Sequence, residues 1–205
     1  MNILFFGDSL TAGENSQYKY TDFLPKKDSI QNLAVSGTTI GEYSIYPVDG
    51  NSLLSQISKH TEDIQDADVI YIEYGANDIS SVMCGFATLK TVIISLVKSL
   101  DWIHQLNNKA KVIFLALGND KVLLKHSERM CKYLENDYFK SFGFSFPITV
   151  YLRMYKHFIN DVKKICPDVK YMFDDAMVKD MSYLSDDGIH PNAKGHQRIA
   201  ENISK

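Results

Sequence analysis

Three residues at opposite ends of the chain carry the side chains of a serine-based acyl-transfer site. Ser9 stands in the segment Gly-Asp-Ser-Leu, directly after the strand-like run Asn2–Phe6, so a turn at the end of the first strand presents it. Near the other end, Asp187 precedes His190 by three positions. A histidine activates a serine hydroxyl by taking its proton, and a carboxylate holds that imidazole in the required tautomer. The pattern predicts Ser9 as nucleophile, His190 as base and Asp187 as the residue that orients His190.

Two further turns, each after a predicted strand, contain groups that could bind the negative oxygen formed in acyl transfer. Gly37 follows the second predicted strand, and its lack of a side chain lets its backbone N–H approach a ligand closely. Asn77 follows the third predicted strand, in the segment Gly-Ala-Asn-Asp. We expect the N–H groups of Ser9 and Gly37 and the Asn77 amide to form an oxyanion hole. Losing one such donor typically slows catalysis by about 10²–10³.

Together, these four segments resemble the sequence blocks of the SGNH hydrolases, also called GDSL esterases and lipases. They occur in that family's order, from Ser9 to His190. The resemblance implies a serine esterase that hydrolyses a carboxylic ester through an acyl-enzyme. It assigns Ser9, Asp187 and His190 to the catalytic triad, and Gly37 and Asn77 to the oxyanion hole. It also implies a flavodoxin-like three-layer α/β/α fold and no metal or organic cofactor.

The same resemblance leaves the substrate open among acyl esters. It implies a small-molecule, lipid or carbohydrate ester, such as an acetylated carbohydrate, a lysophospholipid or a thioester. The other large serine-esterase class uses Gly-x-Ser-x-Gly at its nucleophile elbow, and here Thr11 occupies the final glycine position. That difference favours the SGNH family over the α/β-hydrolase fold.

Strand-like and helix-like segments alternate along the chain, which is typical of a parallel sheet covered by helices on both faces. We therefore predict one domain over residues 1–205, with about five parallel strands in a three-layer α/β/α sandwich. The predicted strands are Asn2–Phe6, Ser29–Val35, Asp68–Tyr74, Lys111–Leu117 and Val169–Phe173. The predicted helices are Ser52–Gln65, Thr88–Gln105, Lys121–Tyr133, Thr149–Lys164 and Ala193–Ile203, the last capped by Asn192.

An aromatic-rich insertion around residues 119–147 is longer than this alternation requires. Its part Asn136–Pro147 has no clear helical period, and a long irregular segment in a compact domain is often a binding loop or lid. Packing against the core or the sheet edge is an equally good interpretation. The candidate substrate-binding aromatics are Phe142 and Phe144 of this stretch, together with Tyr43 and Tyr46 after the second predicted strand. They could line an acyl pocket or stack on sugar rings.

Composition and charge exclude several other classes. The net charge of −3 on 205 residues provides no basic surface for nucleic acid or anionic membranes. Cys84, Cys131 and Cys166 are odd in number and widely spaced, which favours a reducing compartment over a disulfide framework. The run Val92–Val97 is too short to span a bilayer, and no signal-peptide pattern precedes the first strand. We expect a cytoplasmic protein without stable membrane insertion, although export that needs no N-terminal signal stays open, and we predict no oligomeric state.

Three alternative interpretations use the same residues. A metal could bind Asp187, His190 and His196, but a zinc site needs three or four converging ligands, and His196 lies on the last predicted helix. A flavin or nucleotide binder is disfavoured because Asp8 and Glu14 place negative charge where phosphate would sit. The third alternative is a non-catalytic module that binds an ester or glycan on the same fold.

One residue of the third predicted strand is an exception to its apolar character. Glu73 is a carboxylate within an otherwise apolar segment. A buried carboxylate is costly unless it is hydrogen-bonded. We expect Glu73 to be a satisfied structural group or to form hydrogen bonds near the site.

Overall fold

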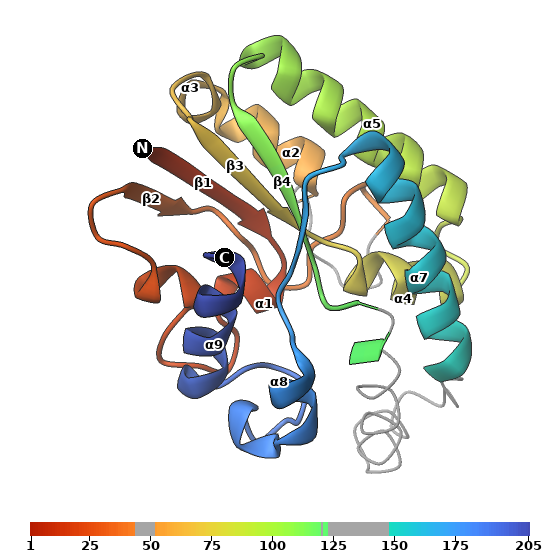
Figure 1. The fold of residues 1–205 in the computed structure, drawn as a ribbon. Coiled ribbons are helices and arrows are strands. Elements are labelled where there is room, and N and C mark those ends of the chain that lie inside the picture. Colours follow the sequence, from red (N-terminus) through yellow and green to blue (C-terminus); the bar gives the residue numbers. More distant parts are fainter. Residues whose placement is uncertain (44–51, 120, 123–147) are drawn as a thin grey trace.

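In the computed structural model, five parallel strands form one sheet at the centre of the protein (Figure 1). The structure describes residues 1–43, 52–119, 121–122 and 148–205. The strand order is β2-β1-β3-β4-β5, so the first strand lies between the second and the third. This confirms the predicted parallel sheet. The strand bounds are β1 Asn2–Gly7, β2 Ser29–Asn32, β3 Val69–Glu73, β4 Lys111–Ala116 and β5 Val169–Tyr171.

Helices cover the two faces of this sheet and complete the three-layer α/β/α sandwich that the sequence predicts (Figure 1). One layer contains α2 (Leu53–Lys59), α3 (Thr61–Gln65), α5 (Leu89–Leu106) and α7 (Ile148–Ile165), with α4 (Ala76–Met83) packed against α5 and α7. On the other side, α9 (Ala193–Ile203) packs against the 3₁₀ helix η1 (Tyr20–Phe23). The shorter helices are α1 (Ser9–Ala12), α8 (Asp175–Lys179) and η3 (Met181–Tyr183).

Most predicted helices occur with nearly the expected bounds. Helix α9 has the predicted range, and its cap is the Asn192 side chain, which accepts the Gly195 N–H at 3.1 Å. The predicted helix Ser52–Gln65 is instead two helices, because His60 leaves the helical conformation (φ −121°, ψ 35°) between them. The predicted helix Lys121–Tyr133 lies almost wholly outside the described residues.

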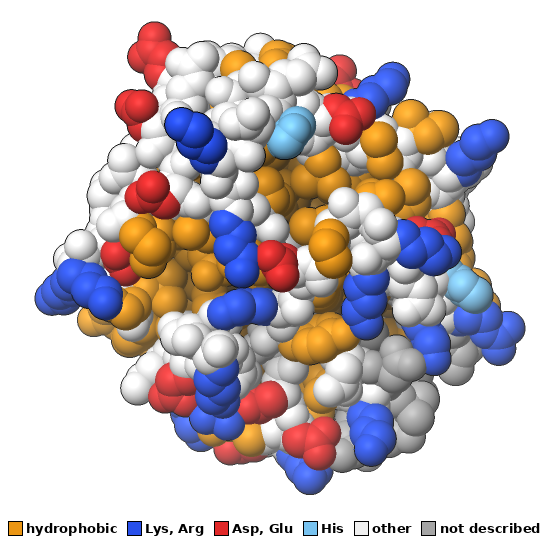
Figure 2. Space-filling view, turned by 45° about the horizontal axis from the view of Figure 1, so that its top comes forward, with side chains coloured by type: hydrophobic (Ala, Val, Ile, Leu, Met, Phe, Trp, Pro, Cys, Tyr) orange, Lys and Arg blue, Asp and Glu red, His pale blue; other side chains and the backbone are white. Residues whose placement is uncertain are grey.

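The central strands are apolar because helices bury them on both faces. Phe5, Phe6, Ile70, Ile72 and Phe114 are fully buried. None of the helices in the part of the chain that the structure describes is long and apolar enough to cross a membrane. On the face drawn in Figure 2, positive and negative side chains are interspersed around apolar patches.

The sheet brings three segments distant in sequence to one edge. Gly7, the last residue of β1, pairs in register with Glu73, the last residue of β3. Strand β2 ends at Asn32, earlier than predicted, yet the Val35 N–H still donates to the Gly7 carbonyl at 3.0 Å. Because parallel strands end at the same edge, the turns that carry Ser9, Gly37 and Asn77 all begin there.

Candidate active site

Ser9 is the first residue of α1, which starts directly after β1. Asp8 caps this short helix, and its Oδ1 accepts the Leu10 N–H at 3.0 Å. The first N–H groups of a helix have no carbonyl partner within the helix. The cap therefore satisfies one of them and presents Ser9 at the carboxyl edge of the sheet.

The structure brings together Ser9, His190 and Asp187, which are distant in sequence. His190 Nε2 lies 2.9 Å from Ser9 Oγ, and His190 Nδ1 lies 2.6 Å from Asp187 Oδ2. An ionised carboxylate only accepts hydrogen bonds, so Nδ1 carries the proton and donates it to Asp187. Nε2 is then the acceptor for the Ser9 hydroxyl. This is the tautomer that a general base for Ser9 requires.

Backbone and side-chain donors hold Asp187 in place. Its Oδ1 accepts the N–H groups of Ile189 and His190 at 2.8 and 2.9 Å, and its Oδ2 also accepts the Asn15 amide at 2.7 Å. Partial burial by itself raises the pKa of Asp187, but the hydrogen bonds from His190, Ile189 and Asn15 outweigh burial and lower that pKa. The carboxylate therefore stays ionised beside His190.

The loop that carries His190 is anchored from its own backbone. The His190 carbonyl accepts the Ser185 N–H at 2.8 Å and the Ser185 hydroxyl at 2.6 Å. An isolated antiparallel bridge joins Leu184 to Pro191. These contacts fix the imidazole without a regular element on either side of it.

Asn77 lies where the three strand-end turns meet. Its amide nitrogen donates to the Thr38 carbonyl at 3.0 Å and to Asp8 Oδ2 at 3.3 Å, so it links the second turn to the Ser9 turn. Gly37, next to Thr38, has a φ of 77°, in the left-handed region that favours glycine. The structure thus places Asn77 against the Ser9 turn and Gly37 in the neighbouring turn, whose Thr38 carbonyl Asn77 contacts.

The turn before Asn77 rests on aromatic side chains of α7. Gly75 has a φ of 125°, and a Cβ there would lie 2.6 Å from the Phe158 ring. The Tyr151 hydroxyl donates to the Ala76 carbonyl at 3.2 Å. Only glycine therefore fits at position 75, where the chain leaves β3 and enters α4.

Tyr43, predicted as a substrate-binding aromatic, takes part in a buried network behind this turn. Its hydroxyl donates to Asp78 Oδ1 at 2.9 Å, and the Ile40 N–H donates to the same oxygen at 2.9 Å. Burial raises the pKa of Asp78 to about 7. Tyr46, Phe142 and Phe144 lie outside the described residues, as does most of the aromatic-rich stretch 119–147.

Other candidate residues lie apart from this constellation. His196 is fully buried on α9 against the Tyr20 ring, and among the described residues neither of its ring nitrogens has a hydrogen-bond partner. No group of three or more metal-ligating side chains occurs within the described ranges. Cys84 and Cys166 are free thiols, whereas Cys131 lies outside those ranges.

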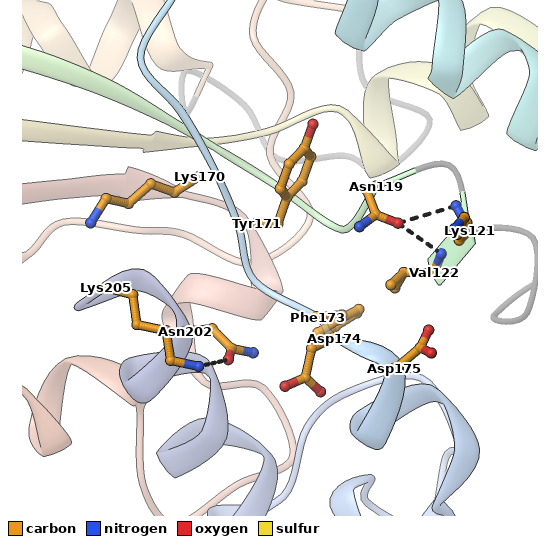
Figure 3. Close-up of a pocket in the computed structure, with 10 residues that line it drawn as sticks. All are labelled: Asn119, Lys121, Val122, Lys170, Tyr171, Phe173, Asp174, Asp175, Asn202 and Lys205. Atoms are coloured by element: carbon orange, nitrogen blue, oxygen red, sulfur yellow. Dashed lines mark hydrogen bonds between the residues drawn. The ribbon is translucent and has the colours of Figure 1, made fainter.

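A cavity of about 440 Å³ lies elsewhere, between β5 and the ends of α8 and α9 (Figure 3). Several of its polar groups already have partners within the protein. Lys170 donates to the Ile203 carbonyl, Lys205 donates to Asn202 at 3.3 Å, and Asp174 pairs with Arg198 at 2.6 Å. None of the residues that line it belongs to the Ser9 constellation.

The three-layer α/β/α fold, with Ser9 after β1 in hydrogen-bond contact with His190 of the loop before α9, is the arrangement expected of a serine hydrolase. The chain belongs to the GDSL-like Lipase/Acylhydrolase family, whose sequence model matches residues 5–198. The resemblance predicted from four short segments is therefore confirmed. Membership in this family supports the hydrolysis of esters as the general activity.

Solved structures share the fold over nearly the whole chain. Esterase EstA from Pseudoalteromonas sp. is 16% identical with a TM-score of 0.66, and the match covers 100% of this chain and 95% of that one. The lipase Lip_vut3 from a goat rumen metagenome is 17% identical with a TM-score of 0.63, covering 98% and 95%. Acetylxylan esterase Axe2 from Geobacillus stearothermophilus is 15% identical with a TM-score of 0.61, covering 98% and 91%. The comparison with curated proteins returned no match for this sequence.

Proposed function

We propose that this protein hydrolyses a carboxylic ester through an acyl-enzyme formed on Ser9. The observation that carries the proposal is the continuous set of hydrogen bonds from Ser9 Oγ through His190 to Asp187, at 2.9 and 2.6 Å. Both distances lie within the range expected between a nucleophile, its base and the group that orients the base. Family membership supports the same chemistry.

The proposed reaction has two halves. Ser9 Oγ attacks the ester carbonyl carbon while its proton moves to His190 Nε2. The tetrahedral intermediate collapses, the bond to the alcohol oxygen breaks, and His190 returns the proton to that oxygen. His190 then takes a proton from a water molecule, whose oxygen attacks the acyl carbon. The bond from that carbon to Ser9 Oγ breaks, His190 returns the proton to Oγ, and the acid leaves.

The negative oxygen of each intermediate is proposed to bind the N–H groups of Ser9 and Gly37 and the amide of Asn77. The position of Ser9 in the first turn of α1 supports this role, because N–H groups there lack partners within the helix. Asn77 supports it because its amide lies beside the Ser9 turn, and its N–H toward Asp8 makes a long contact of 3.3 Å that it can share with an oxyanion. Donors held in place before the reaction stabilise charge as it develops, without reorganisation.

Covalent labelling tests this proposal without a guess about the substrate. The purified protein is treated with a fluorophosphonate, and its intact mass is compared with those of Ser9→Ala and Ser58→Ala. Ser58 is an exposed serine on α2, so its variant controls for the loss of a hydroxyl group. We expect one adduct on the wild type and on Ser58→Ala, and none on Ser9→Ala. Folded wild type that takes up no label would overturn the proposal and favour the non-catalytic ester- or glycan-binding module.

A panel of acyl esters addresses the substrate, which we propose to be an acetylated carbohydrate, a lysophospholipid or a thioester. kcat/KM is measured for acetyl, butyryl and octanoyl esters of one alcohol. A preference for acetyl supports carbohydrate deacetylation, the activity named for the structural neighbour Axe2. A preference for octanoyl supports a lipid or thioester substrate.

A further inference from the structure

Glu73 is a buried acid beside the proposed site with no role in the reaction described above. It is the last residue of β3, and only 1% of its surface is exposed. Removing a carboxyl group from water is expensive unless hydrogen bonds compensate. The partners of Glu73 therefore indicate its role.

Two of these partners lie on either side of Ser9. Glu73 Oε2 accepts the Thr11 hydroxyl at 3.0 Å and the Asp8 N–H at 3.4 Å. Since Thr11 gives its only hydroxyl proton to Glu73, the Tyr20 hydroxyl, 2.9 Å away, donates to Thr11 Oγ1. Glu73 thus holds the nucleophile turn from the sheet side, at the residue before Ser9 and at the second residue after it.

The third partner of Glu73 is the carboxyl group of Asp8, which is 1% exposed. Asp8 also accepts the Leu10 N–H on Oδ1 and the Asn77 amide on Oδ2. Two buried carboxyl groups in hydrogen-bond contact cannot both be ionised, so they share one proton. Burial raises the pKa of Asp8 too, but donors reach both of its oxygens. Both donors to Glu73 reach Oε2, which leaves Oε1 to carry a proton. The shared proton therefore belongs to Glu73.

We propose that Glu73 is a positioning residue, which donates its proton to Asp8 and thereby orients both the Ser9 turn and the Asn77 amide. The inference rests on the proposed function. The chain of contacts from Glu73 to the site is short, because Glu73 contacts Thr11 and Asp8 directly, and Asp8 contacts Asn77. When Glu73 is protonated, the pair carries one negative charge, on Asp8, and both Asp8 oxygens accept hydrogen bonds. An apolar residue at position 73 leaves the Asp8 N–H and one side of the Asp8 carboxylate without a partner, and leaves Tyr20 as the remaining partner of the Thr11 hydroxyl.

The proton on Glu73 makes the arrangement sensitive to alkaline pH. Burial and the negative charge of Asp8 raise the pKa of Glu73 well above its ordinary value. Deprotonation would place two carboxylates in contact in a dry site, and their repulsion would displace Asp8 and with it Asn77. Within the described chain, the other titratable groups that face the pair come from η1, the end of β3, α7, α4 and the last loop: Tyr20, Tyr74, Tyr155, Asp78 and His190.

The test compares Glu73→Gln and Glu73→Leu with the wild type and with Glu62→Gln, which alters an exposed acid on α3. kcat and KM for a short ester are measured from pH 5 to pH 10. Gln can accept from Thr11 and donate to Asp8, so we expect its kcat at pH 7 within about threefold of the wild type. Leu can do neither, and we expect kcat to fall by about 10–100-fold with KM changed less than about threefold.

The pH profile separates positioning from simple structural support. We expect kcat of the wild type and of Glu62→Gln to fall on the alkaline side, and kcat of Glu73→Gln to hold its plateau there. Superimposed profiles for the wild type and Glu73→Gln would overturn the inference, as would an undiminished kcat in Glu73→Leu. If Glu73→Leu does not fold, the pH dependence of kcat in Glu73→Gln still tests whether Glu73 has a positioning role.

A stability measurement distinguishes failure of this inference from failure of the proposed function. Because folding raises the pKa of Glu73, the stability that its proton supplies is present at low pH and is lost as pH rises through the folded pKa. The wild type should therefore lose stability relative to Glu73→Gln between pH 5 and pH 9. This stability measurement does not depend on catalytic activity. Wild type that shows the trend but takes up no fluorophosphonate would disprove the esterase alone, and a missing trend would disprove the shared proton.

Discussion

The Asn15 amide nitrogen lies 2.7 Å from Asp187 Oδ2, although the two residues are 172 positions apart. The same oxygen accepts His190 Nδ1. Asn15 has a positive φ of 56°, a conformation that asparagine tolerates better than most residues. A residue of the loop after α1 thus helps to hold the carboxylate that orients the proposed base.

Replacing Asn15 with glycine should therefore slow catalysis. Glycine tolerates the same φ, so Asn15→Gly removes the amide without backbone strain. We expect kcat to fall by about three- to tenfold, since one hydrogen bond to a charged group contributes about 1.5–3 kcal/mol and only part of that acts in the transition state. Asn108→Gly, at an asparagine after α5 and far from Asp187 in sequence, is the control. A kcat equal to that of the control would show that Asp187 needs no support from Asn15.

The Asn77 amide is expected to act on the transition state more than on substrate binding. Asn77→Ala should lower kcat by about 10²–10³ and change KM little, as the loss of an oxyanion donor does. Steady-state kinetics on a short ester provide the measurement. The opposite pattern, a raised KM with normal kcat, would assign Asn77 to substrate binding and leave the oxyanion to the backbone N–H groups.

A methyl group at Gly75 should disturb both stability and activity. Gly75→Ala forces an unfavourable φ and brings Cβ to 2.6 Å from the Phe158 ring. Gly85 is a matched control, because its φ is 80° and a Cβ added there would meet nothing within 4 Å. Gly85→Ala should cost about 1 kcal/mol for the left-handed conformation alone. Gly75→Ala should cost about 1–3 kcal/mol more, as overpacking does, and should also lower kcat. Urea unfolding of the two variants measures the difference, and equal losses would contradict the steric argument.

Buried His196 should make the protein sensitive to mild acid. Burial lowers the pKa of His196 from 6.5 to about 4, so the unfolded chain binds the proton more readily than the folded protein. Its contribution to stability is complete above pH 6.5 and is lost as pH falls toward 4, by an amount on the order of 3 kcal/mol.

Urea unfolding at pH 7 and pH 5 checks this expectation. His196→Leu should lose less stability than the wild type over that interval, because leucine has no proton to bind. His104→Gln, at an exposed position on α5, should follow the wild type. An equal loss of stability in His196→Leu would mean that other groups account for the acid sensitivity. Asp174 is one such group, because the pKa of its carboxyl is lowered in the folded protein.

Local patterns were sufficient to predict the sheet, most helices and the turns of the site. The strands are short apolar runs with helical segments between them, and parallel strands necessarily end at one edge. Ser9, Gly37 and Asn77 were therefore expected to lie together, and the structure places their turns at that edge. The contact between Ser9 and His190 followed from residue chemistry and the family resemblance rather than from periodicity.

Features that depend on tertiary packing were harder to predict. The burial of His196 depends on which face of α9 packs against Tyr20, and the break at His60 depends on how two helices fit the sheet. Glu73 was recognisable as a polar exception, but its partners Asp8 and Thr11 are more than 60 positions away. No local pattern encodes such a pairing.

The distance along the chain between Ser9 and His190, 181 positions, has a consequence for protein synthesis. At about 5–20 residues per second, a ribosome needs roughly 10–35 s to add the histidine after the serine. Throughout that interval the nascent polypeptide contains Ser9 but lacks its proposed base, His190. The proposed esterase is therefore inactive while it is being synthesised. Its activity begins only when the loop that carries His190 packs beside the end of the first strand.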